Sequence, residues 1–282
     1  RPVVAAGALA VAALASCSLT TSLDGLTSEG ATTTDAGDGS TKLDEGGKTL
    51  LDGAVPDVAV EGEGGPQAAF CVREPGHLLC SDFESGSVLD GKWDGTSING
   101  TSTLTREEGS AASGRGNLVS NTSAISTAET HAVLVKNYTQ TMKSLTFAAS
   151  IKIVDCTPTG TGQASLLSVS AGPATDKWIT SILVTPSGTV FNATKCPSGT
   201  CTGSNGTLAV APPANTWSRV VMTIDLQATT ATVTVDGKLA LDKLKIAITA
   251  QNASANLNVG SSVRAPSGAC RIEYDDVTFD IQ

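Results

Sequence analysis

Two short acidic runs carry the side chains that could do acid–base chemistry in this chain. Glycoside hydrolysis uses two carboxylates, and a β-strand places residues i and i+2 on one face. The nearest candidate is the run Glu-Tyr-Asp-Asp-Val-Thr at 273–278, where only the first two carboxylates alternate. Glu107 and Glu108 are adjacent, so a strand would point them to opposite faces, and Gly109 follows at once. We interpret this second pair as part of a solvated loop.

Aromatic rings are the next candidates, because flat rings stack on sugars. The chain has three Trp, two Tyr and five Phe, which a sandwich of this size can largely use in its core. Trp178 is the candidate platform, since its predicted strand is apolar on both faces, and the core is the alternative. The Thr-, Ser- and Asn-rich stretches 95–105 and 202–207 could hydrogen-bond a glycan or simply be solvated loops. Composition does not separate these alternatives.

Cysteines indicate disulfides rather than metal chemistry. The chain has two His and no Cys-x-x-Cys, so neither a zinc site nor a Cys–His nucleophile is indicated. Apart from Cys17, six cysteines remain, which suggests three disulfides in an exported domain, with 15 conceivable connectivities. Short sequence separation favours two pairs and leaves the third: Cys71–Cys80, Cys196–Cys201 and Cys156–Cys270.

Period-2 alternation of apolar residues predicts the elements that must position these groups. In 216–241, two alternating runs flank a polar loop, and Asp236-Gly237 then suits a type I′ turn, so we predict a hairpin. Turn residues separate many such runs, and no stretch has a sustained helical period. We predict an all-β, two-sheet antiparallel sandwich with strands near 117–121, 130–136, 144–154, 163–170, 177–185, 188–193, 216–226, 230–236, 256–260 and 270–281.

The two ends of this region carry a resemblance. The run Ser-Asp-Phe-Glu-Ser-Gly at 81–86, followed by Trp93, and the closing run Glu-Tyr-Asp-Asp-Val-Thr-Phe at 273–279 resemble the first and last strands of concanavalin A-like, laminin G-like jelly rolls. The hairpin with Val-Asp-Gly-Lys at 235–238 resembles their penultimate hairpin. In the closing run the apolar phase slips by one residue, which predicts a β-bulge at Asp275-Asp276.

The resemblance implies a structural Ca²⁺, because related jelly rolls often hold one between the opening and closing strands. Asp82, Glu84 and Asp276 could supply some of the 6–8 oxygens that Ca²⁺ takes. The alternative is that these carboxylates cap turns or accept backbone hydrogen bonds. No other cofactor is indicated.

The resemblance also gives expectations about activity. Jelly-roll glycanases of the family-16 type carry a Glu-x-Asp-x-x-Glu array, and in this chain Thr278 stands where its last Glu would be. The Arg, Gln, His and Tyr motifs of alginate-lyase jelly rolls are not found either. We therefore expect no catalysis, and a non-catalytic module that recognises a glycan or another envelope component. The alternatives are a structural or adhesion protein that binds other proteins, and a divergent glycoside hydrolase or polysaccharide lyase.

The N-terminus predicts export. The uncharged apolar run at 3–15 is too short to span a membrane. It predicts a signal peptide that covers residues 1–17. Leu-Ala-Ser-Cys at 14–17 matches the bacterial lipobox, which predicts lipidation of Cys17 and membrane attachment through the acyl chains. Ser18 favours the outer membrane of a Gram-negative bacterium, on either its periplasmic face or the cell surface.

Charge separates a tether from the folded region. Residues 18–66 carry ten acidic and two basic residues and no aromatic one, which predicts a disordered tether with a net charge of −8. Residues 67–282, the predicted jelly-roll domain, carry 15 basic and 17 acidic residues, a net charge of −2. With Arg1 these give the chain's −9. A nearly neutral domain excludes nucleic acid as the expected partner.

Overall fold

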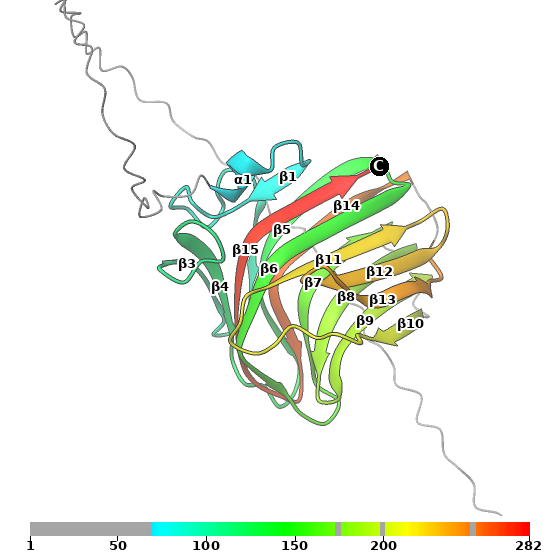
Figure 1. Ribbon diagram of the computed structural model, residues 1–282. Helices are drawn as coiled ribbons and strands as arrows, with labels where there is room; N and C mark the ends of the chain where they lie inside the picture. The colour runs from blue at the N-terminus through cyan, green and yellow to red at the C-terminus, as the bar shows by residue number, and fades with distance from the viewer. Residues whose placement is uncertain (1–68, 173–175, 198–200, 249–251) are drawn as a thin grey trace, which may run out of the picture. The chain divides into compact units, whose positions relative to one another are not determined.

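Two antiparallel β-sheets make up nearly all of the structure, a computed structural model that describes residues 69–172, 176–197, 201–248 and 252–282 (Figure 1). The predicted signal peptide, Cys17 and the whole of the predicted tether lie outside the described residues. Sheet A has eight strands: β13 (Lys238–Lys245), β12 (Thr230–Val235), β11 (Ser218–Asp225), β6 (Ser144–Pro158), β15 (Ser267–Ile281), β4 (Gly116–Thr122) and β3 (Thr103–Glu108) in spatial order, with β1 (Leu79–Ser81) also pairing with β15.

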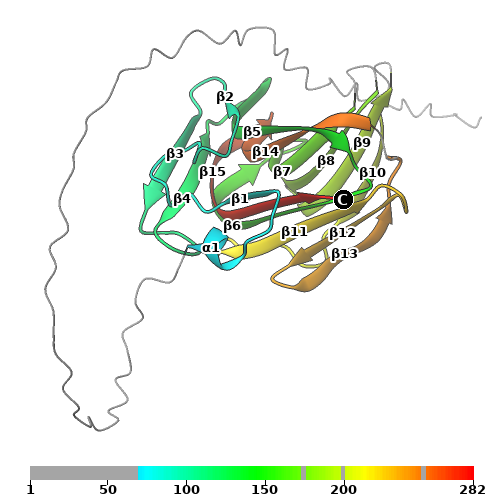
Figure 2. The same cartoon turned by 90° about the horizontal axis from the view of Figure 1, so that it is seen from above.

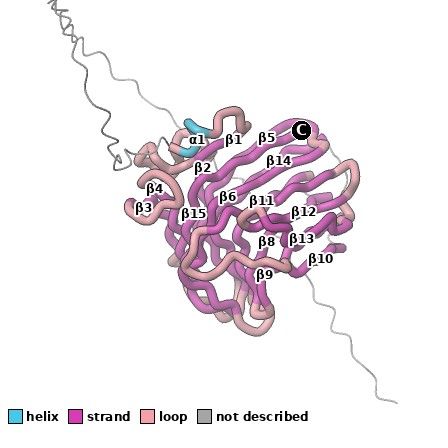
Figure 3. The backbone as a smooth tube through the Cα atoms, viewed as in Figure 1, coloured by secondary structure: helices cyan, strands magenta, loops and turns pink. Residues whose placement is uncertain are grey.

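Sheet B has seven strands: β10 (Thr202–Thr207), β9 (Gly188–Pro197), β8 (Asp176–Thr185), β7 (Gln163–Ala171), β14 (Asn252–Arg264), β5 (Glu129–Thr141) and β2 (Gly95–Ile98) in spatial order. The two sheets stack as two layers (Figure 2), and the predicted all-β jelly-roll sandwich is confirmed. The one described helix is α1 (Phe70–Arg73), a single turn beside β1 (Figure 3). Among the described residues no helix is long and apolar enough to cross a membrane.

The predicted hairpin and its turn are confirmed. β11 and β12 pair antiparallel, with Val220 opposite Val235 and Ile224 opposite Ala231, and buried residues alternate with partly exposed ones along both strands. Asp236 and Gly237 have φ angles of +51° and +72°, as a type I′ turn requires. β13 then begins at Lys238 as the edge of sheet A.

The predicted β-bulge is confirmed in β15. The pairing of β15 with β6 shifts register between Asp275 and Thr278, and Asp276 has a φ angle of +49°. The shift lets Tyr274 and Phe279, which differ in parity, both point into the core.

All ten predicted strands occur, and five strands were not predicted: β1, β2, β3, β10 and β13. The stretches 95–105 and 202–207 were expected to be loops, yet β2, the start of β3 and β10 lie there. Glu107 and Glu108 end β3 rather than lying in a loop, and Asp82 and Glu84 follow the three-residue β1 instead of forming an opening strand. β2 and β10 have no fully buried residue, so the apolar alternation that marks a strand is absent from their sequences.

The core lies between the sheets and joins residues of both in one apolar cluster. Phe147 and Phe279 of sheet A meet edge to face with ring centroids 5.9 Å apart, and Tyr138 of sheet B stacks on Phe279 at 5.2 Å. The three predicted disulfides are confirmed: Cys71–Cys80, Cys156–Cys270 and Cys196–Cys201. The second of them joins β6 to β15 in the middle of sheet A.

Candidate functional site

The acidic run at 273–278 holds other parts of the protein rather than facing an open cleft. Glu273 is nearly fully buried and forms ion pairs with Lys152 at 3.0 Å and with Arg271 at 3.1 Å. Arg271 also pairs with Glu107 at 2.8 Å, and Glu108 pairs with Arg106 at 2.8 Å. These carboxylates are neutralised by neighbours on sheet A.

Asp275 and Asp276 fasten the loop between β3 and β4. Asp275 Oδ2 accepts the backbone N–H groups of Ala112 and Ser113, both at 2.9 Å. Asp276 accepts the hydroxyls of Ser113 at 2.5 Å and Ser150 at 3.3 Å. Burial and, second, the neighbouring Asp276 charge raise the pKa of Asp275 to about 8. The pair therefore holds a loop over the outer face of sheet A.

The calcium candidates bind backbone groups. Asp82 accepts the N–H of Cys71 at 3.0 Å, and Glu84 accepts those of Arg115 and Gly116 at 2.7 and 2.8 Å. Glu84 and Asp276 thus contact the same loop, whereas Asp82 contacts the N-terminal segment. Within the described ranges no three His, Cys, Asp or Glu side chains are close enough together to hold a metal ion. The calcium site stays a prediction. The observed contacts are hydrogen bonds from backbone N–H groups, which was the alternative interpretation of these carboxylates.

Trp178 lies in the core, so its proposed role as a ligand platform is corrected. Its side chain is 0% exposed and belongs to the apolar cluster between the sheets. A ligand on either outer face cannot reach this ring. The alternative, in which the sandwich uses its Trp residues for packing, describes Trp178.

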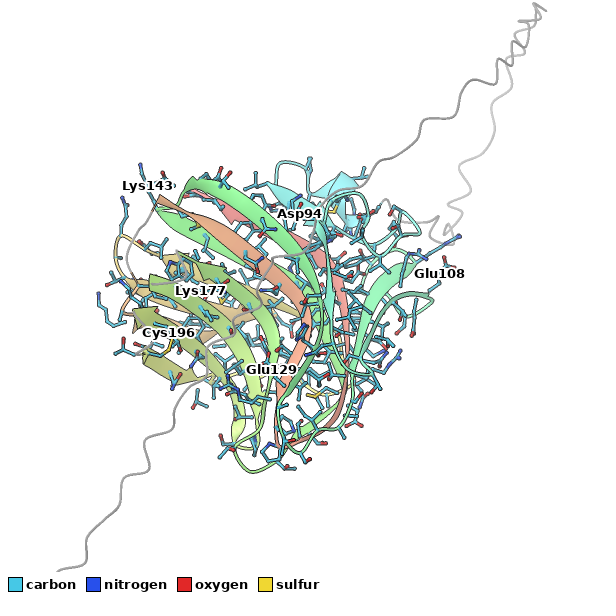
Figure 4. All side chains as sticks on the ribbon, turned by 180° about the vertical axis from the view of Figure 1, so that it is seen from behind. Asp94, Glu108, Glu129, Lys143, Lys177 and Cys196 are labelled. Atoms are coloured by element: carbon cyan, nitrogen blue, oxygen red, sulfur yellow. A yellow bond between two sulfur atoms is a disulfide. The ribbon has the colours of Figure 1, made fainter. Side chains whose placement is uncertain are left out.

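The outer face of sheet A is largely occupied by the protein itself. In addition to the β3–β4 loop, the N-terminal segment crosses it, where the Phe70 ring lies 5.1 Å from the Arg219 guanidinium. Arg219 in turn donates to the Asp276 carbonyl and to Thr278 Oγ1. On the outer face of sheet B, which Figure 4 shows from behind, no described helix or loop is hydrogen-bonded to the side chains of Ser168 or Ser181, although Ser181 is only 6% exposed.

A row of small polar side chains crosses that open face. Strand pairing places Asn258 opposite Ser168, Ser168 opposite Ser181, and Ser181 opposite Asn192, with Asn205 beyond it. We call these five residues the polar row. Neighbouring strands lie about 4.8 Å apart, so the row spans roughly 20 Å across β14, β7, β8, β9 and β10. Uncharged donors and acceptors in a line suit an extended chain of hydroxyl groups.

Amide hydrogen bonds order the row and extend it to β5. Asn258 Nδ2 donates to Asn256 Oδ1 and Asn256 Nδ2 to Asn137 Oδ1, each at 2.9 Å. At the other end Asn192 Nδ2 donates to Asn205 Oδ1 at 2.5 Å. Each amide uses part of its hydrogen-bonding capacity in this way and keeps the remainder for a ligand.

A histidine lies on the same face of β5, six residues before Asn137. His131 Nε2 is 2.9 Å from Ser97 Oγ, and Asn99 Oδ1 accepts the His131 backbone N–H at 2.6 Å. Burial lowers the pKa of His131 below its ordinary 6.5, against an opposing effect of the Glu129 charge. The imidazole is therefore neutral at neutral pH and can accept a proton.

Charged and amide groups surround this histidine. Arg264 lies opposite both Glu129 and Gln163, and Ser262 lies between His131 and Ser165. Diagonal neighbours on a sheet are about 7–8 Å apart, which is within reach of long side chains. We call the group Ser97, Glu129, His131, Gln163 and Arg264 the His131 corner. It combines a neutral base, a cation and an amide on one open face.

The sequence prediction did not include Glu129, His131, Gln163 or Arg264 as site residues, and it included Ser97 only within the stretch 95–105. A histidine at one end of the alternation His131-x-Val133-x-Val135-x-Asn137 was a usable signal, because these four positions share a face. What sequence alone did not give is the pairing of β5 with β2 and β14, which brings Ser97 and Arg264 to that histidine.

Comparison with known proteins supports the fold. The structure is similar to an endo-β-1,4-glucuronan lyase from the fungus Trichoderma reesei, with a TM-score of 0.61 and 14% identity over 73% of this chain and 96% of that chain. A κ-carrageenase from Pseudoalteromonas carrageenovora (TM-score 0.44, 13% identity, 72% and 92% of the two chains) and the carbohydrate-binding module CBM66 from Bacillus subtilis (0.34, 12%, 67% and 96%) are less similar. No protein-family model and no curated protein sequence matches.

The glucuronan lyase supports the class of fold, a two-sheet jelly-roll sandwich. It also corrects one expectation. The domain was expected not to be an enzyme because it lacks the paired-carboxylate array, but the best-matching of these three structures is a polysaccharide lyase. A β-elimination needs one base beside an acidic carbon rather than two carboxylates, so the missing array does not argue against catalysis.

Proposed function

We propose that the described domain is a polysaccharide-cleaving enzyme that binds a uronate-containing polysaccharide across the outer face of sheet B and cleaves it by β-elimination. The observation that carries this proposal is the His131 corner, where a neutral imidazole, Arg264 and Gln163 share an open face with the polar row. The similarity to a glucuronan lyase supports the fold that such an activity would use.

The chemistry assigns a role to four of the five groups of the corner, whereas the Glu129 carboxylate accepts a hydrogen bond from Ser262 Oγ at 2.8 Å. In β-elimination a base removes the proton from the carbon next to the uronate carboxylate, a C=C bond forms, and the glycosidic C–O bond breaks as its oxygen takes up a proton. His131 is the base, because its lowered pKa keeps it neutral. Arg264 and Gln163 stabilise the negative charge that develops on the carboxylate. Ser97 positions the imidazole through its 2.9 Å contact.

The polar row runs from β14 to the β10 edge, on one side of the His131 corner, and serves binding of the chain on that side of the bond that breaks. A chain lying across the strands meets one Asn or Ser side chain per strand, and each sugar hydroxyl both donates and accepts a hydrogen bond. Such contacts fix the chain's position without a charged partner. Binding energy from sugars remote from the bond can then orient the reacting unit.

The test is to incubate the protein with polyglucuronate, polymannuronate and a neutral β-1,4-glucan, and to measure unsaturated products by ultraviolet absorbance and mass spectrometry. From a uronate polymer we expect shortened chains whose unsaturated products are each lighter by one water than the corresponding hydrolysis products, and from the neutral glucan we expect no products. If the new chain ends are saturated, the protein is a hydrolase and the proposed lyase activity is wrong. Absence of any cleavage by a folded protein would overturn the proposal.

We also propose that the chain is exported and anchored by lipid on Cys17, which fits the lipobox at 14–17. The three disulfides of the domain are consistent with an oxidising compartment outside the cytoplasm. A palmitate analogue fed to cells making the protein is expected to label it, and Cys17→Ser is expected to abolish the label. Equal labelling of both proteins would contradict the anchor.

A further inference from the structure

A pocket of about 580 Å³ lies away from the outer face of sheet B, between the N-terminal segment and one end of β5. Its walls include His77, Lys92, Lys136 and Tyr138, together with the Cys71–Cys80 disulfide. Lys136 and Tyr138 occupy even positions of β5, whereas His131 and Asn137 occupy odd ones, so the pocket and the His131 corner are separate. Its volume lies within the range of about 300–1,000 Å³ usual for small-ligand sites.

Carboxylates outside the pocket lining hold its basic groups in place. Lys92 Nζ pairs with the buried Asp90 at 3.1 Å, Lys136 Nζ with Asp94 at 2.7 Å (Figure 4 labels Asp94), and His77 Nδ1 with Asp280 at 2.7 Å. Each ammonium has three N–H donors, so donors remain for a ligand. Their charges are already balanced, and Glu74 adds a negative charge to the lining, which disfavours an anion.

Tyr138 contributes a hydroxyl without a partner. Its oxygen is buried and forms no hydrogen bond with the described residues, although the ring is held by stacking on Phe279. Burial, followed by the charges of Asp94 and Asp280, raises the pKa of Tyr138 to about 12, so the group stays protonated and able to donate. A buried hydroxyl with no partner usually has an unseen one, such as a water or a ligand oxygen.

The segment over the pocket is fixed before any ligand arrives. The disulfide closes the loop from Cys71 to Cys80, and Asp280 Oδ1 accepts the Leu78 backbone N–H at 3.0 Å. Pro75 and Leu79 add apolar lining. A rigid wall lowers the ordering cost of binding.

We propose that this pocket is a second carbohydrate site, which holds one or two units of a neutral saccharide through Lys92, Lys136 and the Tyr138 hydroxyl. A neutral sugar fits because its hydroxyl oxygens accept from these donors, its hydroxyl hydrogens reach Glu74 and backbone carbonyls, and its C–H faces pack on Pro75. The inference is independent of cleavage at the His131 corner.

The test is calorimetric titration of the protein with three neutral tetrasaccharides, of β-1,4-glucose, α-1,4-glucose and β-1,4-mannose, and with tetraglucuronate. We expect saturable binding of at least one neutral probe, weakened about tenfold in Tyr138→Phe, which removes one hydrogen-bond donor to the ligand. Because that hydroxyl bonds no other described group, the variant should keep its fold. Lys92→Met tests the contribution of a second residue of the pocket lining. Lys143→Met, at an exposed position outside the lining, is its control.

The outcomes separate this site from the proposed cleavage site. Neutral-sugar binding that persists in His131→Gln and is weakened in Tyr138→Phe supports the second site even where no polymer is cleaved. Binding to none of the neutral probes would overturn it. Binding that both Tyr138→Phe and Lys92→Met leave within about twofold of the unchanged protein would also overturn it, since the ligand would then lie elsewhere.

Discussion

Replacing His131 by glutamine is expected to lower the rate of polysaccharide cleavage by about 10²–10⁴-fold, the usual contribution of a positioned general base. Glutamine preserves a polar side chain that can bond Ser97 but cannot take up a proton. The polar row is untouched, so the affinity for the polymer should change little. The measurement is the initial rate of formation of unsaturated ends, with polymer binding determined separately.

The matched control is Thr139→Ala, an exposed position on the same face of the same strand. It should cleave at the unchanged rate and melt at nearly the unchanged temperature. If His131→Gln cleaves as fast as Thr139→Ala, the base lies elsewhere and the assignment of the corner is wrong. A loss in binding equal to the loss in rate would instead make His131 a binding residue.

The pH profile gives an independent check on the same residue. Burial lowers the pKa of His131 from 6.5, so the imidazole becomes a competent base as the pH rises through a value below 6.5. Cleavage is therefore expected to rise with pH and to have its acid midpoint below 6.5. A midpoint well above 6.5 would exclude a desolvated histidine as the base, because desolvation of a cation can only lower its pKa.

The central strands were predictable from sequence, and the edges were not. β11 and β12 bury alternate residues in the core, so their apolar periodicity is strong and the hairpin followed from it. The type I′ turn followed from Asp236-Gly237, and the bulge at Asp275-Asp276 followed from the slip of apolar phase in β15. β2 and β10 are edge strands with no fully buried residue, and their order comes from pairing with β5 and β9. The residues of β2 and β10 do not themselves indicate that pairing.

The residues of the candidate site were harder to predict from sequence than the edge strands. Asp82, Glu84 and Asp276 were recognisable as special, but a sequence does not tell a metal ligand from a carboxylate that accepts backbone N–H groups. Trp178 was chosen because its strand is apolar on both faces, and this pattern also describes a fully buried strand. His131 depends on neighbours 34 residues before it and 133 after it, which only the strand register brings together.

Removing the Cys156–Cys270 disulfide is expected to cost about 5 kcal/mol of unfolding free energy, whereas removing Cys196–Cys201 should cost about 2 kcal/mol. The two bridges close loops of very different length, with sequence separations of 114 and 5. Longer loops lose more entropy in the unfolded chain when they are closed. The first bridge also links β6 to β15, whose pairing is interrupted between Cys270 and Ser267 and again at the bulge.

The comparison uses the paired variants Cys156→Ala with Cys270→Ala and Cys196→Ala with Cys201→Ala, so that no free thiol remains in either protein. Urea unfolding of each, under the same non-reducing conditions, gives the two losses. A larger loss for the 196–201 pair, or equal losses, would show that native-state contacts rather than chain entropy decide the contribution of these bridges. If the losses follow loop length, the Cys156–Cys270 bridge between β6 and β15 contributes most to stability, because it closes the longest loop that a disulfide closes in the domain. Reduction of the protein would then weaken the connection between these two strands most.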